Sequence, residues 1–236
     1  MTALDYQGGE LALFAHAVNW KRYFSSKITP YLGESVLEVG AGLGTTTVAL
    51  YSGQSRWVCL EPDPQMAKRL GDAVTQGMLP VQCRIQAGTT SDLIAADQGE
   101  RYDSVIYIDV LEHIEDDSGE LARAFALLRP SGTLVVLSPA FQWLYTAFDH
   151  AIGHVRRYDR DRLTAIAPAG AASVRMSYLD SVGMAASMAN RLLLRSGMPT
   201  LGQVLTWDRW MVPASRYFDP LIGGRFGKSI LAVWRR

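Results

Sequence analysis

The chain has 236 residues, of which 48% are apolar and 19% are charged, and its 23 Lys and Arg residues balance 23 Asp and Glu residues. This composition suits one folded domain, excludes a disordered chain and argues against a general polyanion-binding surface, so we expect no nucleic-acid partner. The chain lacks a basic segment followed by an apolar run, and also any stretch of about 18 uncharged apolar residues. We therefore expect a cytoplasmic protein without a transmembrane segment.

Short β-rich runs alternate with helical patterns along most of the chain. Strands are predicted at residues 35–40, 56–62, 81–88, 102–110, 132–138, 173–179 and 229–234, and helices are predicted to begin near Leu43, Pro64, Thr89 and Asp117. Such alternation indicates βαβ crossovers and a parallel sheet with helices on both faces. Cys59 and Cys83 fall in neighbouring buried strands, where structural thiols are expected.

The stretch "VLEVGAGLGTTT", residues 36–47, is typical of a strand, a glycine-rich turn and a helix start. Its glycines are Gly40, Gly42 and Gly44, and Thr45 stands where the dinucleotide fingerprint requires a third glycine. The turn also lacks the lysine of a phosphate-binding P-loop. Phosphate is therefore not the expected ligand, which argues against a nicotinamide oxidoreductase.

Two carboxylates flank this turn. Glu38 precedes the first glycine, where a negative charge would repel a pyrophosphate and attract a cation. S-adenosylmethionine carries such positive charge on its sulfonium and ammonium groups. Glu61 ends the second strand, at the position where a carboxylate accepts hydrogen bonds from ribose hydroxyls in folds of this kind.

Four motifs together resemble the class I S-adenosylmethionine-dependent methyltransferases: "EVGAGLG", "LEP", "YDSVIYIDVLEHIEDD" and "LRPSGTLVV". The resemblance implies a doubly wound, Rossmann-like, mostly parallel seven-stranded sheet with helices on both faces and a helical substrate cover. It also implies S-adenosylmethionine as cofactor. The expected cofactor-binding residues are Glu38, Gly40, Gly42, Gly44, Thr45, Glu61, Pro62, Gly88, Thr89, Asp109 and Val110.

The resemblance divides one methyltransferase domain into three parts. Residues 1–33 are expected to form an N-terminal helical cap, 34–138 the cofactor-binding core, and 139–236 the substrate-side insertions and last strands. The chain departs from many relatives because "QAGTTSDL" has no Asp directly after the third strand. Adenine contacts are therefore expected from the Ala87–Thr89 backbone or the Thr89 hydroxyl.

The segment "PAFQWLY…D…GHVRRY" is similar to a subgroup found beside glycosyltransferases in bacterial polysaccharide or secondary-metabolite pathways. We therefore expect O-methylation of a small molecule, sugar or glycan, with N-methylation of an amino sugar as an alternative. His154 is the preferred general base, with Asp149 as its orienting carboxylate or as an alternative base. His113 is expected to shape the site, whereas His16 is expected to have a packed or surface role.

Residues after the fifth strand are also candidates for acceptor binding, because open α/β sheets bind ligands beyond their strand ends. These residues are Tyr145, His150, Arg156, Arg157 and Tyr158. The arginines suit an anionic acceptor. Pairing of "RRYDRDR" with its own aspartates is an equally supported alternative.

A metal-dependent alternative uses some of the same residues. Asp109, Glu112 and His113, with His150 or His154, are similar to the "ExxEH…H" set of metal-dependent small-RNA 2′-O-methyltransferases. Because "DVLEHI" also occurs in metal-free relatives, we predict no metal and keep this alternative, with RNA as its acceptor, open. A binding module without turnover is a further alternative.

The segment 184–226 is too polar to span a membrane but is rich in Met, Trp and Leu. Ordinary packing onto the domain is the favoured interpretation. A lid over an apolar acceptor, a homodimer surface and a helix in weak contact with a membrane are the alternatives.

Overall fold

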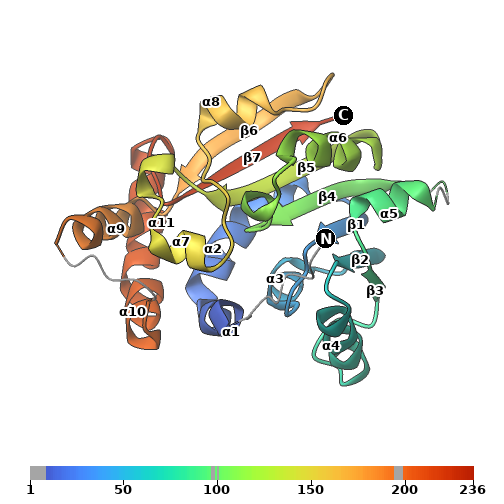
Figure 1. Cartoon of the computed structure of the whole chain (residues 1–236), viewed down its shortest axis with the longest axis horizontal. Helices are drawn as coiled ribbons and strands as arrows, with labels where there is room; N and C mark the ends of the chain where they lie inside the picture. The colour runs from blue at the N-terminus through green and yellow to red at the C-terminus, as the bar shows by residue number, and fades with distance from the viewer. Residues whose placement is uncertain (1–8, 97–98, 100, 194–198) are drawn as a thin grey trace.

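A computed structural model describes residues 9–96, 99, 101–193 and 199–236, which form one seven-stranded sheet in the order β3-β2-β1-β4-β5-β7-β6 (Figure 1). Neighbouring strands are parallel except that β7 runs antiparallel to both β5 and β6. The strands are β1 (Ser35–Val39), β2 (Arg56–Glu61), β3 (Cys83–Ala87), β4 (Tyr102–Ile108), β5 (Leu128–Pro139), β6 (Ala172–Leu179) and β7 (Ser229–Arg235). The predicted doubly wound, mostly parallel seven-stranded fold is confirmed.

Helices cover both faces of this sheet (Figure 1). The α-helices are α1 (Gly9–Ala15), α2 (Val18–Ile28), α3 (Thr45–Leu50), α4 (Pro64–Thr75), α5 (Thr90–Ala95), α6 (Asp117–Ala126), α7 (Ala147–Ala151), α8 (Arg160–Ala165), α9 (Ser181–Leu193), α10 (Leu201–Thr206) and α11 (Val212–Leu221). Short helical turns are η1 (Thr29–Tyr31), η2 (Leu111–His113), η3 (Gln142–Leu144) and the π-helical η4 (Trp207–Met211).

Alternating strand side chains build two separate cores. In β1, Val36 packs into a core with Phe24 of α2 and Val212 of α11, whereas Leu37 packs into the opposite core with Leu121 of α6 and Leu163 of α8. This period of two explains why the central strands β1, β2 and β4 are largely apolar, since both of their faces are buried, whereas β3 and β6 are partly exposed.

Of the element boundaries that differ from the sequence expectation, three have a clear structural basis. Helix α3 begins at Thr45 rather than near Leu43, because the left-handed backbone of Gly42 and Gly44 cannot belong to a helix. Strand β3 begins at Cys83 rather than at residue 81, after a turn. Strand β5 begins at Leu128, which pairs with Tyr102 across an irregularity in register, whereas residue 132 was the predicted start.

The carboxyl ends of β1, β2, β4 and β5 meet along one edge of the sheet, and the antiparallel β7 begins at that same edge. The loops that follow these strands therefore converge there. Cys59 and Cys83 lie buried and free on adjacent strands, as predicted. None of the helices in the described part of the chain is long and apolar enough to cross a membrane.

Candidate functional site

The glycine-rich turn after β1 is shaped by backbone conformations that favour glycine. Gly40, Gly42 and Gly44 have φ values of 70°, 55° and 73°. A Cβ atom on Gly40 would lie 2.7 Å from Cγ2 of Val110, at the end of β4. The turn thus lies directly against the loop after β4, in backbone conformations that glycine adopts without strain.

Glu61 lies at the end of β2 with its carboxylate against this turn. Its Oε2 accepts a hydrogen bond from the Gly42 amide at 2.8 Å, and its Oε1 accepts one from the Asp63 amide at 3.1 Å. Burial raises the pKa of Glu61, although these two amides partly oppose the shift. Each carboxylate oxygen keeps a second lone pair, so the side chain is fixed in place and still able to accept from a ribose. Pro62 follows it and is exposed.

Glu38 was expected at the mouth of the turn, but it does not lie there. It is buried beneath the turn, 2% exposed, where its Oε2 accepts hydrogen bonds from Thr47 Oγ1 at 2.6 Å and from Trp57 Nε1 at 2.8 Å. Burial raises the pKa of Glu38 to about 7. Direct attraction of a cationic ligand is therefore not its role: it joins α3 to the sheet below the turn.

Gly88 and Thr89 lie beside Glu61, because the Gly88 amide donates to the Glu61 carbonyl oxygen at 3.0 Å. Thr89 caps α5, and its hydroxyl donates to Asp92 Oδ2 at 2.8 Å. The Thr89 amide also donates to Asp92 Oδ2 at 2.8 Å, so the hydroxyl and the amide both serve this cap, and the expected adenine contact stays a prediction.

Asp109 follows β4 with a left-handed backbone, φ 55°, and keeps an exposed side chain. Surrounding protein nevertheless reduces its hydration and raises its pKa to about 6, against the charges of His154, Lys228 and Lys21. Neither lysine was found by the sequence analysis. Lys21 comes from α2 and Lys228 directly precedes β7, so the tertiary fold rather than the local sequence brings them near Asp109.

His154 and Asp149 form a buried pair in the loop after β5. His154 Nδ1 lies 3.0 Å from Asp149 Oδ1, and Asp149 also accepts from Arg157 Nε at 2.8 Å and Nη2 at 3.0 Å. Although burial opposes its charge, hydrogen bonds from His154 and Arg157 hold the pKa of Asp149 below its ordinary value. Asp149 is therefore a fixed anion that orients His154, and its role as an alternative base is not supported.

Three of the expected acceptor-binding residues point into the protein instead. The fork of Arg157 holds Asp149, and Arg156 Nη1 pairs with Asp117. Tyr158 is fully buried and donates to the same Asp117 carboxylate at 3.0 Å. An acceptor-binding role for these three side chains is wrong, because partners inside the protein occupy their polar groups. The carboxylates that pair with Arg156 and Arg157 are Asp117 and Asp149, so they are not the aspartates of "RRYDRDR".

His150 and Tyr145 have other surroundings. His150 is exposed on α7 and does not join His154. The Tyr145 hydroxyl donates to the backbone oxygen of His154 at 2.6 Å, which fixes the loop. His16 is exposed at the end of α1, in keeping with the surface role expected for it.

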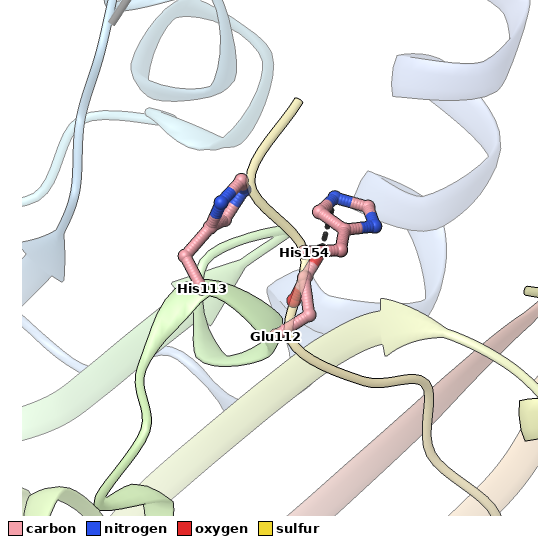
Figure 2. Close-up of side chains that lie close together, drawn as sticks. All are labelled: Glu112, His113 and His154. Atoms are coloured by element: carbon pink, nitrogen blue, oxygen red, sulfur yellow. Dashed lines mark ion pairs between the residues drawn. The ribbon is translucent and has the colours of Figure 1, made fainter. Parts of the chain in front are cut away.

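Glu112, His113 and His154 lie together where the loops after β4 and β5 meet (Figure 2). One ligand atom from each lies within 4.8 Å of the others, and His154 Nε2 is 3.8 Å from Glu112 Oε1. The Glu112 carboxylate is fully buried without a hydrogen-bond partner among the described residues. Burial and the neighbouring Asp109 raise its pKa, whereas burial and His154 lower the pKa of His113 to about 4.

Aromatic side chains from three elements pack together. The Phe14 ring of α1 lies 6.3 Å from Phe148 of α7 and 6.3 Å from Trp207 of η4, measured between centroids. Leu11 of α1 reaches the glycine turn, since a Cβ on Gly42 would lie 3.5 Å from its Cδ1. These contacts join α1, α7 and η4 and bring α1 against the glycine turn, whereas a helical substrate cover stays a prediction. The division into residues 1–33, 34–138 and 139–236 stays a prediction.

Residues 15–169 match the family described as a methyltransferase domain. A ubiquinone biosynthesis O-methyltransferase from Xylella fastidiosa (strain 9a5c) is 31% identical over 122 residues, which cover 51% of this chain and 48% of that protein. A protein of the same name from Methylobacterium sp. (strain 4-46) is 30% identical over 44% of this chain and 40% of its own. The chain thus spans about half the length of the curated relatives it matches.

Solved structures with low sequence identity share the fold. Coclaurine N-methyltransferase, bound to N-methylheliamine and S-adenosylhomocysteine, superposes with a TM-score of 0.62 at 11% identity, over 93% of this chain and 72% of that chain. The cyclase SpnF superposes at 0.61 and 12% identity, over 91% and 80%. Because the fold also carries a cyclase, the family match rather than the fold decides the assignment. The chain belongs to the methyltransferase domain family, among the class I S-adenosylmethionine-dependent methyltransferases.

Proposed function

We propose that the protein transfers a methyl group from S-adenosylmethionine to an oxygen atom of a small molecule, sugar or glycan. The observation that carries the proposal is the buried Asp149–His154 pair at the strand ends that form the cofactor edge. The names of the curated relatives support oxygen as the methylated atom.

The residues around the glycine turn fit the cofactor. Side chains are absent at Gly40, Gly42 and Gly44, where the chain approaches Val110 and Leu11 closely, and the Glu61 carboxylate is held ready to accept from hydroxyl groups. S-adenosylmethionine supplies an activated methyl group on its sulfonium. The backbone of this turn and Glu61 would position the cofactor, with Ala87–Thr89 beside the adenine.

His154 carries out the proton transfer in this mechanism. Donation from Nδ1–H to Asp149 leaves the lone pair on Nε2, which can accept the acceptor's hydroxyl proton as its oxygen bonds to the methyl carbon. The proton would then remain on His154, stabilised by the Asp149 carboxylate, until it passes to solvent. The aromatic cover of Phe14, Phe148 and Trp207 excludes water from this displacement.

The test is release of S-adenosylhomocysteine with catechol, a free sugar and an amino sugar as probe acceptors. We expect turnover on a hydroxyl acceptor and a fall of about 10²-fold or more for His154→Ala, with unchanged affinity for S-adenosylhomocysteine. His150→Ala is the matched control, since this exposed histidine lies outside the pair. Full turnover by His154→Ala would remove the base, and methylation of the amine alone would replace the oxygen acceptor with nitrogen.

A metal-assisted reaction is the second candidate, favoured by the group formed by Glu112, His113 and His154. Two imidazole nitrogens and a carboxylate suit Zn²⁺, Co²⁺ or Mn²⁺, and a bound ion would lower the pKa of an acceptor hydroxyl. His154 cannot serve as ligand and free base through the same nitrogen. Methyltransferase activity that persists after chelation favours His154 as the base. Activity that is lost in chelator and recovers when Mn²⁺ is added favours the metal, provided that Glu112→Gln abolishes this recovery.

A further inference from the structure

The run formed by α10, η4 and α11, residues 201–221, has one buried and one exposed side. Its buried positions recur at intervals of three or four: Val204, Asp208, Val212, Ser215 and Asp219. On the opposite side, Trp210, Tyr217 and Leu221 follow one another at intervals of seven and four, and they are 66%, 79% and 79% exposed. Large apolar side chains are seldom this exposed in a group, and such a group is typical of a surface that binds a partner.

We call this side the outer ridge, defined by Leu205, Trp210, Tyr217, Phe218 and Leu221, each at least 45% exposed. It lies at the end of the molecule formed by α9, α10 and α11, away from β1 to β3 (Figure 1). The loop after α11 adds Phe226, which is 55% exposed.

The charges on this surface have one sign. Arg209 and Arg216 are exposed on the helical run, and Arg225 is exposed in the following loop. The acids of the same segment face inward: Asp208 accepts from the Trp20 amide at 2.8 Å, and Asp219 accepts from Tyr23 Oη at 2.6 Å. The outer ridge is therefore bordered by positive charge, and the acids of the same segment are hydrogen-bonded inside the protein.

We propose that the outer ridge binds the surface of an anionic lipid membrane. Helices that lie in the interface of a bilayer typically combine tryptophan, tyrosine and leucine with arginine. Their apolar side chains enter the boundary of the acyl chains, and their arginines contact lipid phosphates. The proposed function does not require this surface. It adds a place of action, because Trp207 of the same run packs against Phe14 over the site, so a bound membrane would lie beside the acceptor's side of the fold.

The experiment is flotation of the full chain with vesicles of phosphatidylcholine alone and of phosphatidylcholine with one quarter phosphatidylglycerol. We expect the protein to float with the anionic vesicles and to remain unbound with the neutral ones. Arg209→Gln and Arg216→Gln should each weaken binding by about fivefold, and 0.5 M salt should weaken it further. Trp210→Ser with Leu221→Ser should reduce binding at least tenfold.

Matched control variants distinguish membrane binding by the outer ridge from nonspecific association with vesicles. Val81→Ser, at an 80% exposed position after α4, and Arg69→Gln, on the exposed side of α4, should leave vesicle binding unchanged. Binding of S-adenosylhomocysteine by each variant verifies that it folds and reports on the proposed function separately. Absence of flotation, flotation unaffected by the ridge variants, or a dimer in solution that those variants dissociate would each overturn the proposal; the last outcome would identify a second copy as the partner.

Discussion

The indole of Trp57 donates a hydrogen bond to the buried carboxylate of Glu38 across the first two strands, at 2.8 Å. The two residues lie two register positions apart on adjacent parallel strands, since Glu38 pairs with Cys59 and Val36 with Trp57. This bond, together with that from Thr47, holds a carboxylate in the core at the base of the glycine turn.

Glu38 makes stability depend on pH. Burial raises its pKa in the folded protein to about 7, above its ordinary value near 4.5, so the folded state holds a proton that the unfolded state has lost between these values. The stabilisation is complete below about pH 4.5 and is lost as the pH rises through 7, by on the order of 3 kcal/mol. Urea unfolding of the wild type and of Glu38→Gln from pH 5 to 8 should show this fall in the wild type; equal slopes would contradict it.

Glu61→Ala should weaken binding of S-adenosylhomocysteine by about 2–3 kcal/mol, because charge-assisted hydrogen bonds to the ribose are lost. Isothermal titration calorimetry measures the change. Asp63→Ala is a suitable control, since Asp63 caps α4 two residues further on and faces its helix. Equal affinity of Glu61→Ala and wild type would exclude Glu61 from the cofactor site.

Gly40→Ala and Gly53→Ala separate backbone strain from collision. Both glycines have positive φ, 70° and 108°, so each alanine costs about 1 kcal/mol of folding free energy. Only at Gly40 would the new methyl group meet Val110, at 2.7 Å, whereas nothing lies within 4 Å at Gly53. Thermal unfolding should therefore show the larger loss for Gly40→Ala, together with weaker cofactor binding; matching losses would show that Val110 moves aside.

Arg157→Met should destabilise the protein by about 3 kcal/mol or more, because it leaves the buried Asp149 carboxylate without its guanidinium partner. Arg129→Met removes a pair with Asp103 in which the arginine side chain is 49% exposed, and should cost less than about 1 kcal/mol. Chemical denaturation measures both. A small loss for Arg157→Met would mean that Thr146 and His154 stabilise Asp149 sufficiently.

The sequence pattern was enough to predict the sheet and the glycine turn, because strand burial on two faces and positive φ at glycine leave marks in local sequence. It was also enough to pair Asp149 with His154, five residues apart in one loop. It misplaced Glu38, since a carboxylate at a strand end reads as solvent-facing unless the positions of Thr47 and Trp57 are known.

Long-range partners account for the other errors. Arg157 and Tyr158 carry polar groups that suit a ligand, and local sequence does not show that Asp149 and the more distant Asp117 already hold them. Lys228 was missed because its surroundings come from distant parts of the chain. It directly precedes β7, and its Nζ lies 4.7 Å from the centroid of the Trp207 ring. No local pattern distinguishes such a lysine from a surface one.

The place of β7 between β5 and β6 also governs the order in which the sheet can assemble. Among the strands of the described residues, β6 pairs with β7 alone, and β7 spans residues 229–235. During synthesis β1 to β5 can pair in sequence, but β6 waits without a partner until those residues leave the ribosome. The edge of β5 and the apolar side of β6 are exposed for that interval, so deletion of β7 would leave an aggregation-prone intermediate rather than a smaller enzyme.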